Sequence, residues 1–164
     1  MQERSILSII YTLFVGLLMA FFVGFGINTF YAPPSSPQYP AILNGGQKEA
    51  TNEQIAAQIK FDNQIKNYQM LMRPYNRNVS IITLIAAVVL LVISLIYENR
   101  IRFISDGVIL GGLFTLVYSL IRSFASGDSR YIFMVISISL IVVLVMGYRQ
   151  FVTSHVSYKP KVSH

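Results

Sequence analysis

The residues that could carry out chemistry are few and lie far apart. The two histidines, His155 and His164, are both near the carboxyl end, and such a widely separated pair does not form a metal site on its own. The chain has no cysteine, which excludes disulfides, thiol nucleophiles and cysteine-ligated metal centres. The sequence also lacks phosphate-cradling glycine loops and zinc-protease patterns. We therefore expect no catalytic residues, no metal ligands and no cofactor, and a protein that is not an enzyme.

Three charged residues next to long apolar runs are the remaining candidates for a function that depends on charge. Arg102 and Asp106 are one helical turn apart at the start of such a run, where the helix dipole favours an anion and the two side chains share a face. Arg122 lies about 24 Å further along a helix, so it cannot pair with Asp106. Its long side chain can snorkel to the helix end and reach Asp128 in the following turn. We interpret these charges as structural.

Composition places the chain in a membrane. Of its 164 residues, 54% are hydrophobic and 12% are charged, which is too little polar surface to cover a soluble domain. Four apolar runs, uninterrupted by proline, match the roughly 20 residues that a helix needs to cross the hydrocarbon core. Aromatic residues mark most of their ends, as is typical of the membrane interface. We expect residues 1–164 to form a single all-α membrane domain with four transmembrane helices, at about 5–31, 79–97, 103–124 and 131–148.

A long excursion, residues 32–78, separates the first two spans. Its first part carries four prolines, which predict an extended path for residues 32–40. Thr51 and Gln54 have the spacing of a capping box, and neither glycine nor proline follows until Pro74. This pattern predicts an extramembrane amphipathic helix at about 52–72. We expect Pro74 to break or kink the chain before the second span.

One face of the predicted helix at 52–72 is apolar. Its residues recur at spacings of three and four, which places them on the same side of the helix, and they are Phe61, Ile65, Tyr68 and Met72. The simpler interpretation is that this stripe packs on the four spans or lies on the lipid surface. The alternative is a docking face for a partner subunit.

Small residues recur every four positions in two of the predicted spans. They are Gly16, Ala20 and Gly24 in the first span, and Gly107 and Gly111 in the third. This spacing lets two helix backbones approach closely. We expect these residues to pack the first and third spans together, or alternatively to face a second subunit. We expect Ser94, Ser119, Ser137 and Ser139 to bond across helices or to their own helix.

The distribution of lysine and arginine predicts the orientation of the chain. With four spans both ends lie on one side, which carries six of these residues, against four close to a span on the other side. We therefore expect both termini in the cytoplasm, the 32–78 loop outside, and a plasma or inner membrane location. The basic polar tail, residues 149–164, is expected to be attracted to anionic lipid headgroups.

These features favour a non-catalytic function. The net charge of +6 is scattered and does not form a block, so we expect no nucleic acid partner. The expected partners are membrane lipids and either another membrane protein or a second copy of the chain. The preferred function is that of an accessory, scaffolding or assembly subunit of a membrane complex. The alternative is an oligomeric channel or transporter in which Asp106 or Arg122 forms charged rings at the mouths of a pore.

Overall fold

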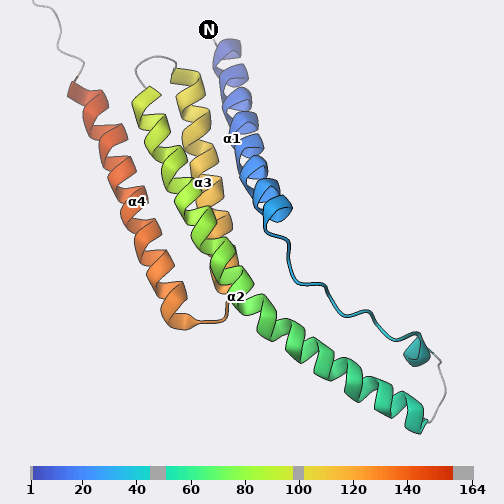
Figure 1. The fold of residues 1–164 in the computed structure, drawn as a ribbon. Coiled ribbons are helices and arrows are strands. Elements are labelled where there is room, and N and C mark those ends of the chain that lie inside the picture. The colour runs from blue at the N-terminus through green and yellow to red at the C-terminus, as the bar shows by residue number, and fades with distance from the viewer. Residues whose placement is uncertain (1, 45–50, 98–101, 157–164) are drawn as a thin grey trace, which may run out of the picture.

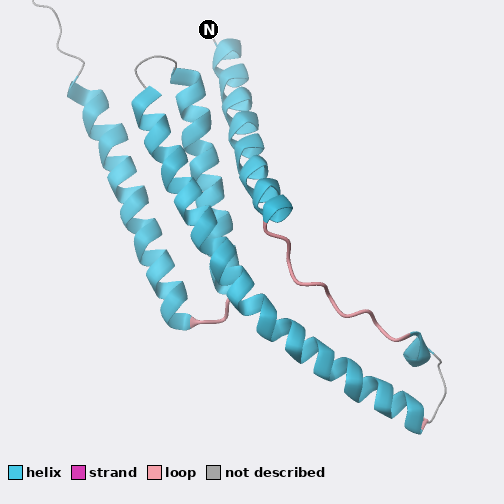
Figure 2. Cartoon of the chain, viewed as in Figure 1, coloured by secondary structure: helices cyan, strands magenta, loops and turns pink. Residues whose placement is uncertain are grey.

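The chain forms four long helices and one short 3-10 helix, as seen in a computed structural model (Figures 1 and 2). The structure describes residues 2–44, 51–97 and 102–156, with side chains described for 6–43, 51–96 and 104–149. Within these ranges every regular element is helical, which confirms the predicted all-α class. The elements are α1 (Gln2–Phe30), η1 (Ala41–Asn44), α2 (Asn52–Tyr97), α3 (Arg102–Phe124) and α4 (Ser129–Val156).

All four long helices are long and apolar enough to cross a membrane. The prediction of four long apolar helices is confirmed, although the run at 79–97 forms only the second half of α2. One difference concerns the carboxyl end, because α4 continues to Val156 and so includes the first residues of the expected polar tail. The start of α1 and the end of α4 lie at the same end of the bundle (Figure 1).

Of the two outcomes expected at Pro74, a break or a kink, the break is not found, because α2 runs through this residue and joins the helices expected at 52–72 and 79–97. At 46 residues, α2 is about 69 Å long at 1.5 Å per residue, roughly twice what a bilayer requires. Proline lacks an N–H and so removes one hydrogen bond, to the carbonyl of Met70, but the Pro74 side chain is exposed. The helix changes direction between its two halves instead of ending (Figure 1). We call residues 52–73 of α2 the outer arm.

The proline-rich residues 32–40, here called the strap, run from the end of α1 back along the outer arm (Figure 1). The ring of Tyr39 meets Phe61 of the arm edge to face, with centroids 5.3 Å apart. Beyond the strap, Gln54 donates a hydrogen bond of 3.2 Å to the carbonyl of Ile42. The side-chain oxygen of Gln54 accepts a bond of 3.0 Å from the backbone N–H of Thr51, which is one of the two hydrogen bonds of the capping box predicted at the start of α2.

Within the bundle α3 is central and packs along both α1 and α2, whereas the α4 backbone lies farther from its neighbours. Long side chains bridge that wider spacing, since Met146 of α4 joins Ala87, Leu91 and Leu116 in the buried apolar cluster. The outward faces of α1 and α4 are lined by exposed large apolar side chains. A water-soluble monomer rarely exposes so large an apolar surface, so these faces are consistent with a membrane protein.

Candidate functional site

The most elaborate polar site surrounds Arg122, near the end of α3. Its Nε donates to the hydroxyl of Tyr118 at 3.0 Å, and one terminal nitrogen donates to Oδ1 of Asn76 at 2.8 Å. The guanidinium carbon also lies 5.4 Å from the ring centre of Tyr75 and 5.5 Å from that of Tyr118. Both distances are within the range of cation–π attraction. The guanidinium is therefore held between two tyrosines by directional contacts, and all these partners are uncharged.

The same site ties α2 to the end of α1 and to the turn after α3. The rings of Tyr75 and Tyr31 are stacked at 5.2 Å, and the Tyr75 hydroxyl donates to the Tyr31 carbonyl at 3.2 Å. Asn78 donates to the Tyr31 hydroxyl at 3.0 Å, and Asn76 donates to the carbonyl of Ala125 at 3.2 Å. We call Tyr31, Tyr75, Asn76, Tyr118 and Arg122 the arginine–tyrosine cluster.

The three charged residues predicted as candidates do not come together. Arg122 does not use Asp128, whose Oδ1 accepts hydrogen bonds from the backbone N–H groups of Arg130 at 3.0 Å and Tyr131 at 3.4 Å. Asp128 thus caps the start of α4, where a carboxylate is favoured by the helix dipole. Asp106 is partly exposed near the opposite end of α3 from Arg122. The side chain of Arg102, its expected partner, lies outside the described residues.

The interface between α2 and α3 is lined by small hydroxyl side chains. Ser80 and Ser119 exchange hydrogen bonds: each hydroxyl donates to the other residue's carbonyl, at 2.9 and 2.8 Å. Near the other end of the hairpin, Ser105 donates to the carbonyl of Ser94 at 2.8 Å. Small residues permit this close approach, and the hydroxyls find partners on the facing backbone. We call these four residues the serine pairs.

The four serines predicted to bond across helices or to their own helix differ in the hydrogen bonds that they make. Ser119 bonds across helices, whereas Ser94 and Ser137 donate to carbonyls of their own helices, those of Leu91 and Phe133. Ser139 is buried and its hydroxyl has no hydrogen-bond partner, as is also true of Ser123. Ser80 and Ser105 were not anticipated, because a serine inside an apolar run does not reveal which helix it faces.

Removing the Ser80–Ser119 exchange should destabilise the bundle modestly and cooperatively. We expect Ser80→Ala and Ser119→Ala each to lower the free energy of unfolding by about 1 kcal/mol, since interhelical hydrogen bonds in membrane proteins contribute up to about 1.7 kcal/mol. Each change removes a separate hydrogen bond to a backbone carbonyl, but the two hydroxyls also contact each other at 3.3 Å. Because either change removes this shared contact, the double variant should lose less than the sum. Ser137→Ala, on an exposed face, is the matched control. Strict additivity in a detergent unfolding series would contradict this prediction.

The predicted small residues are distributed unevenly between the helices. A Cβ built on Gly107 would lie 2.8 Å from Cγ1 of Val15, and one on Gly111 would lie 2.7 Å from Cβ of Met19. A Cβ on Gly16 would lie 3.0 Å from Cβ of Leu110. These glycines therefore sit where α1 and α3 approach each other. In contrast, Gly24 has no neighbour within 4 Å of a Cβ, and Ala20 is half-buried.

The apolar face of the outer arm is partly occupied by the chain itself. Phe61, Ile65, Tyr68 and Met72 are all half-buried. Phe61 contacts Tyr39, and Tyr68 lines a groove of about 560 Å³ between the arm and the strap. The arm leaves other large apolar side chains exposed, namely Ile55, Ile59, Met70 and Leu71.

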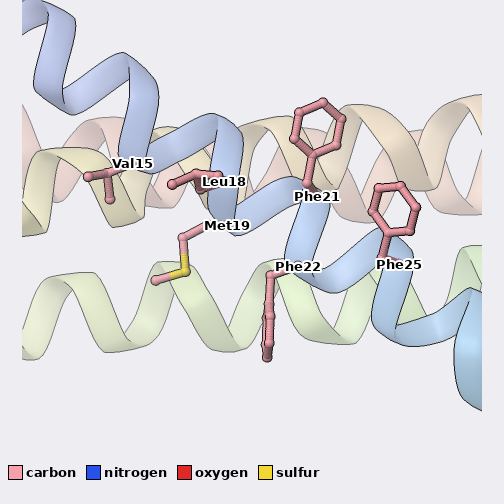
Figure 3. A pocket seen from close by; sticks show the side chains of 6 residues that line it. All are labelled: Val15, Leu18, Met19, Phe21, Phe22 and Phe25. Atoms are coloured by element: carbon pink, nitrogen blue, oxygen red, sulfur yellow. The ribbon is translucent and has the colours of Figure 1, made fainter.

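A second groove, of about 550 Å³, lies along α1 and is almost wholly apolar. Its lining residues are Val15, Leu18, Met19, Phe21, Phe22 and Phe25. Phe21 and Phe25 point to one side of the helix, whereas Met19 and Phe22 point to the other (Figure 3). With no polar group to orient a ligand, this surface resembles a lipid-facing groove more than a specific binding pocket.

Among the described residues, no group of three or more His, Cys, Asp or Glu side chains could hold a metal ion. The side chains of His155 and His164 lie outside the described residues.

Comparison of the chain with protein-family models, with curated proteins and with solved structures gave no match. Inferences about function therefore depend on the geometry of this chain alone.

Proposed function

We propose that the protein is an integral membrane protein of the plasma or inner membrane, with both termini in the cytoplasm. In this proposal it is a non-catalytic accessory, scaffolding or assembly subunit of a membrane complex. One observation carries the proposal: hydroxyls inside the bundle bond to backbone carbonyls, while large apolar side chains cover the outward faces of α1 and α4. The polar groups inside the bundle hold its own helices together, and the apolar outward faces are available to bind the helices of another membrane protein.

The serine pairs argue against a water path within a single chain. A hydroxyl that already donates to a carbonyl of the facing helix is committed to holding the two helices together. A pore would need such groups to face an open channel. An oligomer would have to form a path between chains, from outward faces that are mainly apolar.

The outer arm favours a partner with an extramembrane part. It extends beyond the bundle, contacts the strap through Phe61, and exposes apolar side chains such as Ile55 and Ile59. A helix that is already formed loses little conformational entropy when it binds. A second membrane protein could contact both the apolar face of α1 and this arm.

The test is to isolate the tagged full chain in mild detergent from the membranes of the organism that makes it. We expect a second membrane protein in fixed stoichiometry, identified by mass spectrometry. The paired change Ile55→Ser and Ile59→Ser should weaken that association, whereas Lys60→Ser on the same arm should not. Isolation of a single-component oligomer would contradict the proposal. Ion flux through that oligomer, abolished by Asp106→Asn, would establish the pore instead.

A further inference from the structure

Four arginines surround the turn between α3 and α4. Arg73 Nε lies 3.8 Å from the position that a Cβ on Gly127 would occupy. The carbonyl of Arg77 accepts a 3.1 Å bond from the Tyr131 hydroxyl, and the backbone N–H of Arg130 donates to Asp128. Arg122 is linked to the same turn through Asn76, which donates to the Ala125 carbonyl. We call Arg73, Arg77, Arg122 and Arg130 the arginine rim.

The positive charge of the rim is not balanced locally. Residues 73–78 and 118–131 contain these four arginines and a single acid, Asp128. One oxygen of that carboxylate already accepts two backbone N–H groups at the start of α4. The described partners of Arg122 are uncharged, and Arg73, Arg77 and Arg130 are exposed. The rim therefore favours an anionic partner from outside the chain.

The position of the rim indicates what kind of anion it meets. Tyr31, Tyr75, Tyr118 and Tyr131 contact the rim or its neighbours and lie at the same end of the bundle. From this level the apolar helices run in one direction, and the outer arm and strap leave in the other (Figure 1). Tyrosines concentrate at the headgroup level of a bilayer, and arginine side chains snorkel to the same depth.

We propose that the arginine rim binds the phosphate of anionic phospholipid headgroups in the leaflet on the side of the outer arm. This inference rests on the proposed membrane location but not on the proposed partner. A guanidinium can donate two parallel hydrogen bonds to a phosphate. Arg122 has five N–H donors, and two are used within the cluster. Each basic residue near an anionic membrane surface contributes about fivefold in affinity.

The experiment compares lipid binding by the full chain in neutral detergent, counted by native mass spectrometry. The probes are phosphatidylglycerol, zwitterionic phosphatidylcholine and inorganic phosphate. We expect the wild-type chain to prefer phosphatidylglycerol over phosphatidylcholine. The triple variant Arg73→Gln, Arg77→Gln and Arg130→Gln should lower affinity for phosphatidylglycerol about 100-fold, at about fivefold for each charge removed. Arg122 is left intact because it also holds the helices together.

A matched control removes two positive charges from the outer arm, through Lys60→Gln and Lys66→Gln. It is compared with a double rim variant, Arg73→Gln and Arg130→Gln, that removes the same number. The control should keep the preference. A triple arginine-to-lysine variant of the rim, which retains the charge but loses the bidentate fork, should keep part of the preference. The proposal is overturned if the control loses as much as the rim variant, if the rim variant keeps the preference, or if inorganic phosphate competes as well as the lipid. A missing partner protein would contradict only the proposed function.

Discussion

Replacing Gly111 with leucine is expected to detach α1 from α3 and to lower the free energy of unfolding by about 3 kcal/mol. A Cβ at this position would lie 2.7 Å from Cβ of Met19 and 3.3 Å from the carbonyl oxygen of Gly16. Cβ of Met19 is fixed to its backbone and cannot rotate away, so one helix must move. Few other contacts hold α1, because it packs mainly on α3.

Gly24→Leu is the matched control for this prediction. It lies on α1 with no atom within 4 Å of a built Cβ, and leucine has a higher helix propensity than glycine. The control should leave stability unchanged or raise it slightly. Unfolding can be followed in a detergent titration by the near-ultraviolet circular dichroism of the ten tyrosines, since the chain has no tryptophan. Equal losses in the two variants would show that the α1–α3 contact does not hold the helices together.

Replacing Arg122 with methionine should lower the free energy of unfolding by about 2 to 4 kcal/mol. The change removes two hydrogen bonds, to Tyr118 and Asn76, and the attraction to two tyrosine rings. It also leaves Oδ1 of the buried Asn76 without this donor. Arg122→Lys should recover less than half of the loss, because one ammonium group cannot reproduce the planar fork that reaches both partners.

Arg130→Gln provides the comparison, since Arg130 is exposed and its described hydrogen bond is made by the backbone. Its effect on unfolding should be below about 0.5 kcal/mol. Thermal or detergent unfolding of the three variants in one lipid–detergent mixture distinguishes the outcomes. Full recovery by lysine would mean that only the charge of Arg122 matters.

The helices themselves were readable from the sequence because they depend on local patterns. A long run without charge is sufficient to predict a long apolar helix, and the four runs match the four long helices. The start of α2 was also local, since Thr51 and Gln54 contact each other within one turn. These predictions needed no knowledge of which helices become neighbours.

The continuity of α2 through Pro74 was missed because the proline was weighed as a local signal without its surroundings. A proline removes one backbone hydrogen bond, but the next residues are fixed from outside the helix, Tyr75 by Tyr31 and Asn76 by Ala125. These contacts join positions 44 and 49 residues apart in the chain. No periodicity within the segment 73–77 could have shown them.

The arginine–tyrosine cluster was missed for the same reason. Arg122 was recognised as a charge near a helix end, and Asp128 was the nearest acid in the sequence. The short separation of Arg122 and Asp128 in the sequence was misleading. Asp128 accepts from a backbone amide at the start of α4, and Arg122 donates to the uncharged Asn76 instead. A signal was present in the segment 73–77, where Tyr75 lies between two arginines just before the apolar run 79–97.

The continuity of α2 through Pro74 has a mechanical consequence. The arginine–tyrosine cluster fixes α2 near its midpoint, at Tyr75 and Asn76, and about 33 Å of helix extends on either side. Beyond this point the second half of α2 packs along α3, whereas the outer arm extends away from the bundle (Figure 1). Load applied to the outer arm would therefore reach the bundle first at the arginine–tyrosine cluster, as tension on the Tyr75–Tyr31 and Asn76–Ala125 contacts.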